Sequence, residues 1–157
     1  MTPRILSMTD LISLEVGQDF LDRFERICEF LGVEPDLNVT VFECSSLEEF
    51  NQMTGMGYHI GAVYVNGVVY TQPFAILKKK ECFEDIILHE LLHHVLQLNF
   101  HLPHWAEEGI ILTLLGTKPE EIFGYHRECL LRFSEEVTYE EIPHFVDRYR
   151  RSHLEHR

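Results

Sequence analysis

The chain has 157 residues, of which 45% are hydrophobic and 25% are charged, and its formal net charge is -13 at pH 7. A chain of this length can bury a core of its own, so we expect one domain over residues 1–157. The strong negative charge argues against nucleic acid as a partner, because its phosphates would be repelled. No apolar run reaches the length of about 18 residues that a membrane-spanning helix needs, so we expect no membrane segment.

Three elements are predicted in the N-terminal third of the chain. Residues 20–31 carry apolar side chains at helical spacing and are followed by Gly32, which predicts a helix that ends there. Residues 38–43 alternate between apolar and polar side chains, as in a half-buried strand. Ser46 and Glu49 have the spacing of a capping box, which predicts a short helix after this strand.

A β-hairpin is the clearest local signal of the chain. Two strand-like runs, Ile60–Val65 and Val68–Thr71, are joined by Asn66 and Gly67, the dipeptide that two-residue hairpin turns favour. One interpretation is that an edge strand of this hairpin binds an extended peptide through main-chain hydrogen bonds. The alternative is an ordinary strand of a sheet, and the sequence does not separate the two.

The segment from Glu81 to Phe100 holds the most informative motif. It contains neither proline nor glycine and is apolar on most sides, which predicts a largely buried helix. His89 and His93 are four residues apart, so their imidazoles lie on one face of that helix. Glu90 follows the first histidine, which completes the HExxH pattern of zinc hydrolases.

The pentapeptide alone is only moderately specific, because the chain contains 10 histidines. The alternative is a pair of core histidines that bond to main-chain groups or carboxylates, since buried polar groups need partners. His94 cannot share the face of His89 and His93, so we interpret it as a structural residue or one that contacts the site residues without binding the metal itself.

A catalytic zinc ion takes three protein ligands and leaves one position open for water. A second buried helix is predicted over Pro103–Leu115, with Gly116 as its stop. Candidates for the third ligand lie at or near its start, and position alone does not choose among them. Acids there are also typical of a plain helix start. The candidates are His101, His104, Glu107 and Glu108.

The pentapeptide His89-Glu90-Leu91-Leu92-His93, followed by Trp105-x-x-Glu108-Gly109, resembles the gluzincin metallopeptidases. The chain is most similar to the small, single-domain peptidase MA-like or minigluzincin proteins of that group. Residues 38–43, 46–50 and 61–70 resemble the first strand, the following short helix and the hairpin of those proteins.

The resemblance implies that His89, His93 and Glu108 bind Zn2+ and that Glu90 is the general base of a hydrolase that acts on a peptide or protein. Two features depart from the family pattern. Several gluzincins carry an acidic residue one turn after the third ligand, where this chain has Leu112 and then Thr113. The histidine or tyrosine that stabilises the oxyanion in larger members maps to no single residue here. Candidates for that role are Tyr125, His126, Tyr139 and His144.

We therefore expect an α+β fold of the zincin type. A small, mostly antiparallel sheet would pack on the helix of His89 and His93, and a helical C-terminal part would supply Glu108. Imidazole and carboxylate ligands with an open position suit zinc, although cobalt or manganese would also fit. The four cysteines are far apart and form no Cys-x-x-Cys motif, which is typical of a reduced cytoplasmic protein.

Three other functions are open at this stage. The first is a zinc-binding domain with little or no turnover, which acts as an interaction module or is held latent by its C-terminal helices. The second is a peptide deformylase, with Cys44 as the third ligand, although the glycine that precedes that cysteine in deformylases is missing. The third is a helical scaffold that binds no metal. The sequence specifies neither the substrate nor the oligomeric state.

Overall fold

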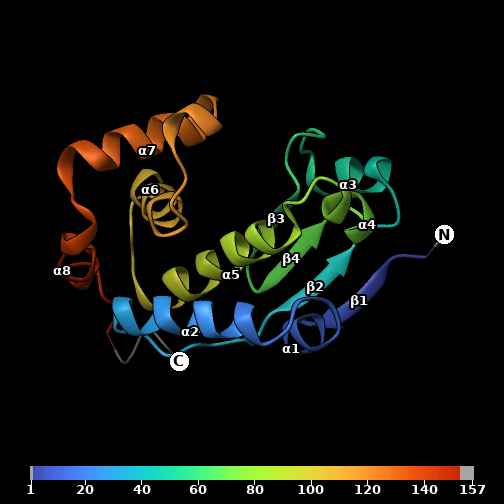
Figure 1. Cartoon of the computed structure of the whole chain (residues 1–157), viewed down its shortest axis with the longest axis horizontal. Coiled ribbons are helices and arrows are strands. Elements are labelled where there is room, and N and C mark those ends of the chain that lie inside the picture. Colours follow the sequence, from blue (N-terminus) through green and yellow to red (C-terminus); the bar gives the residue numbers. More distant parts are fainter. Residues whose placement is uncertain (1, 153–157) are drawn as a thin grey trace. The chain divides into compact units, whose positions relative to one another are not determined.

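The computed structural model describes residues 2–152 of the chain (Figure 1). Helices predominate and a small four-stranded sheet accompanies them, so the predicted α+β class is confirmed. The described helices include none that is both long and apolar enough to cross a membrane.

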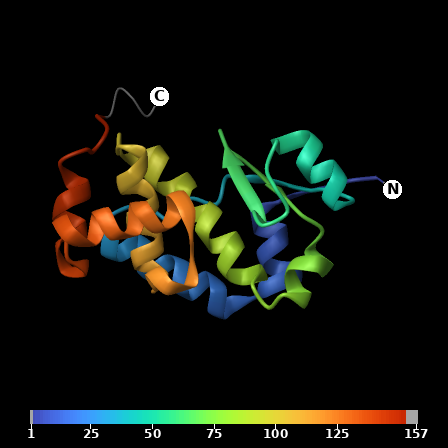
Figure 2. The ribbon, with the colours of Figure 1, turned by 90° about the horizontal axis from the view of Figure 1, so that it is seen from above.

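The chain divides into two compact units. The first unit comprises Met1–Phe24 and Asp36–His94, and the second comprises Glu25–Pro35 and Val95–Arg157. Two helices supply residues to both units. They are α2 (Gln18–Leu31) and α5 (Phe83–Asn99), and Figure 2 shows each of them as a continuous helix. The single domain expected from the sequence stays a prediction.

The sheet belongs to the first unit and has the strand order β1-β2-β4-β3. Strand β1 pairs antiparallel with β2, β2 pairs parallel with β4, and β3 pairs antiparallel with β4. The sheet is therefore mixed, with two antiparallel pairings and one parallel pairing, and β3 lies at an edge. The strands are β1 (Arg4–Ser7), β2 (Thr40–Glu43), β3 (Ala62–Val65) and β4 (Val68–Thr71).

The predicted hairpin is formed by β3 and β4. Its turn residues Asn66 and Gly67 have φ angles of 46° and 87°, both in the left-handed region that a type I′ turn requires. The Asn66-Gly67 dipeptide predicted the turn because both residues readily adopt the positive φ angles that it requires.

Strand β1 and helix α1 (Met8–Leu11) have no counterpart in the sequence predictions. Ser7 caps the helix, because its hydroxyl accepts the N–H of Asp10 at 3.0 Å. Met8 and Leu11 are fully buried. Elements of four residues carry too short a pattern to be recognised before their pairing partner is known.

The other helices of the first unit begin where local chemistry favours a helix start. Helix α3 (Leu47–Thr54) follows the expected Ser46 cap, whose hydroxyl accepts the N–H of Glu49 at 3.0 Å. Helix α4 (Phe74–Lys79), which the sequence analysis did not predict, begins after Pro73. A distant side chain supports its first turn, since Glu43 accepts the N–H of Phe74 at 2.7 Å.

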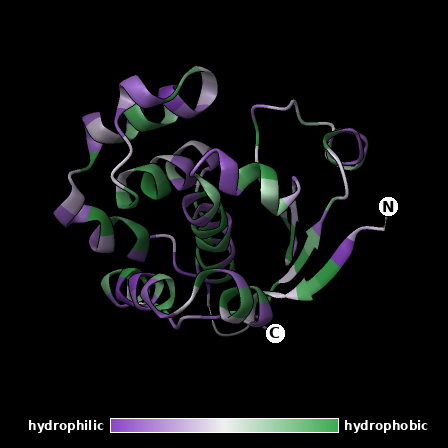
Figure 3. Ribbon diagram, turned by 45° about the vertical axis from the view of Figure 1, so that its right-hand side comes forward, coloured by the Kyte–Doolittle hydropathy of each residue, from purple (hydrophilic) through white to green (hydrophobic). Residues whose placement is uncertain are grey.

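Helix α5 carries the HExxH motif and is buried as predicted. Figure 3 shows hydrophilic and hydrophobic residues interspersed along the helices. In the part of α5 that belongs to the first unit, four apolar side chains are fully inaccessible to solvent. They are Ile87, Leu88, Leu91 and Leu92.

The second unit is helical in its described part. Helix α6 (His104–Leu114) starts after Pro103, as expected, and Gly116 follows its end with a φ of 73°. Helix α7 (Gly124–Glu136) packs against α6, and α8 (Ile142–Asp147) is short. A side chain at position 109 would lie 2.9 Å from Cγ of Phe133 on α7, so the glycine allows the two helices to approach.

Candidate metal centre

The two motif histidines lie side by side on α5. Their ring centroids are 5.1 Å apart and their planes are inclined at 53°. His93 is buried, whereas His89 is partly accessible. This is the arrangement that the four-residue spacing predicted, and two neutral imidazoles so placed offer nitrogen ligands to one ion.

Glu90 is buried and turns toward the sheet. Its Oε1 accepts the main-chain N–H of Tyr64 on β3 at 2.9 Å. Gly61 accepts the N–H of Gln72, which follows β4. Since alternate residues of a strand direct their main-chain groups to opposite sides, Ala62 and Tyr64 face away from β4. The predicted general base therefore contacts the outer side of the edge strand.

His94 has the supporting place that the sequence analysis expected for it. Its Nδ1 lies 2.9 Å from the hydroxyl of Tyr64, and its Nε2 lies 2.8 Å from Oδ1 of Asp36. Burial acts to raise the pKa of the Asp36 carboxyl, but hydrogen bonds from His94 and from the N–H of Asn38 outweigh it and lower the pKa. Asp36 and Tyr64 were not predicted as site residues, because neither belongs to a local motif.

The two acids at the start of α6 differ in their surroundings. Each is only 5% exposed. Glu107 accepts a hydrogen bond at 2.8 Å from the side-chain amide of Gln97, which ties the end of α5 to the first turn of α6. Oε2 of Glu108 instead lies 3.5 Å from Nε2 of His126 on α7.

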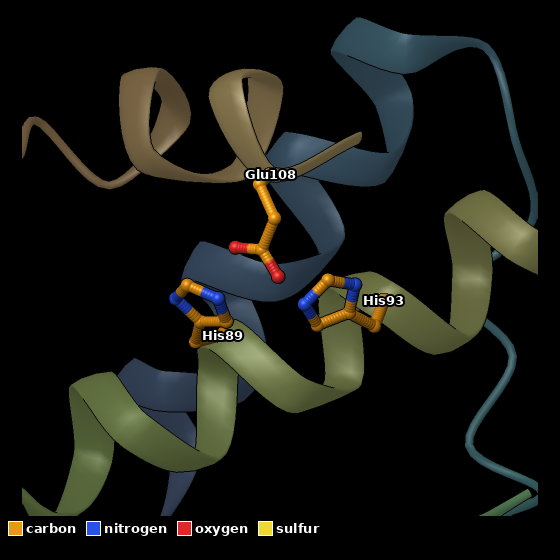
Figure 4. A group of neighbouring side chains, drawn as sticks. All are labelled: His89, His93 and Glu108. Carbon is orange, nitrogen blue, oxygen red and sulfur yellow. The ribbon is translucent and has the colours of Figure 1, made fainter. Parts of the chain in front are cut away.

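A group of three residues in the described part of the chain offers ligand atoms that suit a metal ion. The ligand atoms of His89, His93 and Glu108 all lie within 4.8 Å of one another. Figure 4 shows the carboxylate of Glu108 directed toward the two imidazole rings. Two imidazole nitrogens and one carboxylate oxygen form a donor set that fits zinc with one position open.

The other candidate ligands are not in this group. Nε2 of His101 lies 2.6 Å from a guanidinium nitrogen of Arg151, and Nδ1 of His104 lies 2.8 Å from the hydroxyl of Tyr125. Cys44, the deformylase candidate, is buried at the end of β2, where its N–H donates to the carbonyl of Thr71. Burial and the nearby acids raise the pKa of its thiol to about 11, which disfavours the thiolate that a metal would bind.

Among the proposed proton donors and oxyanion stabilisers, His126 contacts Glu108. The hydroxyl of Tyr125 contacts His104, and burial raises the pKa of Tyr125 to about 12, so the group is protonated at neutral pH. The ring of Tyr139 stacks on Phe30 with centroids 4.8 Å apart.

The position one helical turn after Glu108 is occupied by Leu112 and not by an acid. Leu112 is buried, and the hydroxyl of Thr113 donates to the carbonyl of Gly109 on its own helix at 2.7 Å. The polar group nearest to that position is therefore used within α6.

Comparison of the chain with models of protein families, with curated proteins and with solved structures found no match. The functional conclusion therefore depends on the chemistry of the residues described above.

Proposed function

We propose that the protein is a zinc-dependent metallopeptidase of the gluzincin type. His89, His93 and Glu108 would hold the ion, and Glu90 would act as the general base. The observation that carries this proposal is the convergence of three ligand atoms within 4.8 Å, next to a carboxylate on the same helix as two of them.

A zinc ion in this place would supply a water of lowered pKa and would polarise the carbonyl of a bound peptide. Glu90 takes a proton from the attacking water and delivers it to the leaving amine. Its burial and its position beside His89 support this role. Strand β3 lies at an edge of the described sheet, which is where an extended peptide would pair through main-chain hydrogen bonds.

The edge strand supports an extended peptide or protein as the substrate class. A main-chain edge recognises extended peptides without selecting one sequence, because the hydrogen bonds involve groups that every peptide has. The four cysteines, all within the described residues, are free thiols, which supports the proposal of a reducing, cytoplasmic compartment.

The direct test combines metal analysis with a cleavage assay. The purified chain is stripped with a chelator, reloaded with Zn2+ and incubated with a peptide library, and the products are identified by mass spectrometry. We expect about one zinc per chain and cleavage that is lost on stripping and restored on reloading. A fully loaded protein that cleaves no peptide would refute the peptidase proposal.

A second function is a zinc-binding domain with little or no turnover. The observation that favours it is the lack of an acid one turn after Glu108, where Leu112 is buried and the hydroxyl of Thr113 bonds within its own helix. Such a domain would bind zinc with the same three ligands, so the cleavage assay on loaded protein separates it from a peptidase.

A further inference from the structure

Helix α5 carries two residue pairs with a spacing of four, and the second supplies none of the proposed metal ligands. His89 and His93 form the first pair, and Glu90 and His94 form the second, on a neighbouring face of the helix. Both members of the second pair contact Tyr64 on β3. Glu90 accepts its main-chain N–H at 2.9 Å, and His94 contacts its hydroxyl at 2.9 Å.

The donors in this network follow from the chemistry of Asp36. A carboxylate only accepts hydrogen bonds, so Nε2 of His94 carries the proton in the 2.8 Å contact with Asp36. In the neutral ring Nδ1 is then an acceptor, and the hydroxyl of Tyr64 donates to it. A directed chain of hydrogen bonds thus runs from Tyr64 through His94 to Asp36, and we name these contacts the Tyr64 clamp.

The clamp joins segments that are far apart in sequence. Asp36 precedes β2, His94 lies on α5, and Tyr64 lies on β3, which has a paired neighbour on one side only within the described sheet. An edge strand with one neighbour is held less firmly than a central strand. The hydrogen bond between the Tyr64 side chain and His94 on α5 supplies part of the support that a second neighbouring strand would give to β3.

We infer that Asp36, His94 and the hydroxyl of Tyr64 are positioning residues. They hold β3 against α5 so that the N–H of Tyr64 fixes the carboxylate of Glu90 beside the metal-binding histidines. This inference rests on the proposed function for its catalytic consequence, but the placement of the Tyr64 N–H is a property of the protein without metal.

The test uses the full chain and two readouts. The first is the amide proton of Tyr64 in the metal-free protein, observed by NMR as its chemical shift and its protection from hydrogen exchange. The second is the kcat, the KM and the zinc affinity of the loaded protein. Tyr64→Phe removes the hydroxyl, and Tyr70→Phe is the matched control, because Tyr70 lies on β4 opposite Val63 and its ring contacts Phe42.

Two substitutions of His94 sharpen the test. His94→Asn keeps a polar group near the position of Nδ1 and so retains the contact with Tyr64, whereas His94→Gln keeps one near Nε2 and retains only the contact with Asp36. A purely structural role for His94 would make the two variants alike, whereas the clamp predicts that His94→Gln, which loses the bond to Tyr64 itself, changes the Tyr64 amide more than His94→Asn does.

In Tyr64→Phe and His94→Gln we expect the Tyr64 amide proton to move upfield and its protection to fall about tenfold, as for the loss of one hydrogen bond. We expect kcat to fall roughly 10- to 100-fold, as for a misplaced catalytic group, with zinc affinity unchanged. Tyr70→Phe should stay close to the wild type in both readouts, whereas His94→Asn, which loses the support of Asp36, should lie between the wild type and His94→Gln.

An unchanged Tyr64 amide in Tyr64→Phe would overturn the inference, and Tyr64→Phe decides it even where His94→Gln fails to fold. An altered amide with unchanged kcat would overturn its catalytic part. If the wild type cleaves no peptide, the proposed function fails, and the amide of Tyr64 still decides whether the clamp holds the strand.

Discussion

Glu90 combines burial, a hydrogen bond to a strand and a position beside a histidine of the proposed metal site. A carboxylate held in this way keeps a fixed direction, which a general base needs in order to meet the proton of a water molecule. The substitution Glu90→Gln preserves the shape of the side chain and removes its basicity.

We expect Glu90→Gln to bind zinc as the wild type does and to lose kcat by about 10²- to 10⁴-fold, the range typical of a general base. Metal analysis and the peptide assay measure the two effects. Glu84→Gln, an exposed acid on the same helix, is the control. Activity of Glu90→Gln within a few-fold of the wild type would rule out the proposed role.

The neighbouring acids Glu107 and Glu108 allow a direct comparison within one helical turn. Glu108→Gln removes the proposed carboxylate ligand, so we expect zinc affinity to fall by more than about 100-fold, beyond the loss of a supporting group. Glu107→Gln retains an acceptor for Gln97 and should leave zinc affinity unchanged. Isothermal titration with Zn2+ measures both, and an equal loss in the two variants would contradict the assignment.

At the scale of elements, Gly109 sets how closely α6 and α7 pack. A β-carbon there would meet Cβ of Phe133 first, then Cγ of the same residue at 2.9 Å and the carbonyl oxygen of Cys129 at 3.0 Å. Trp105 on α6 adds to the same packing, because the guanidinium carbon of Arg132 lies 3.8 Å from the centroid of its ring. The glycine that follows Glu108 thus has a structural explanation of its own.

We expect Gly109→Ala to lower the free energy of unfolding by about 1–3 kcal/mol, as overpacking does in well-packed cores. Urea unfolding measures the change. In a double-mutant cycle with Phe133→Ala the cost of the added methyl group should shrink, because that change removes Cγ and the ring and lets Cβ of residue 133 move away. Equal costs in the two backgrounds would place the strain elsewhere.

The 3-10 turn Tyr139–Glu141, which precedes α8, has a contact that depends on pH. The carboxylate of Glu141 accepts both the N–H and the hydroxyl of Thr138 at 2.9 Å, and these bonds lower the pKa of Glu141. A pKa that is lower in the folded state adds stability above the unfolded value of about 4.3 and loses it as the pH falls through the folded pKa.

The wild type should therefore exceed Glu141→Gln in melting temperature at neutral pH, and the difference should shrink as the pH falls below about 4. Thermal unfolding followed by circular dichroism across this range measures it. The exposed neighbour Glu140→Gln is the control. A difference that grows toward acid pH would contradict the sign of the shift.

At the scale of the whole molecule, a bound metal couples to folding. An ion that binds only the folded chain stabilises it by mass action, by about 2.7 kcal/mol when free zinc exceeds its dissociation constant 100-fold. We expect the melting temperature to rise with added Zn2+ and to fall with a chelator. In Glu108→Gln this zinc-dependent shift should be much smaller, and an equal shift there would argue for zinc bound elsewhere.

The features that the sequence by itself determined depend on residues a few positions apart. The Ser46 cap, the Asn66-Gly67 turn and the spacing of His89 and His93 each express backbone or helix geometry within four residues. Such patterns are readable because the local chain dictates which conformations satisfy its own hydrogen bonds.

Only the tertiary structure decided the contacts between distant residues. It paired β1 with β2, gave Glu107 and Glu108 different partners, and joined Asp36 and Tyr64 to His94 across 58 and 30 positions of the chain. A four-residue strand or a single loop aspartate has no periodicity of its own. Its role is set by the partner that packing brings to it, because a buried polar group must be satisfied by whichever group lies within reach.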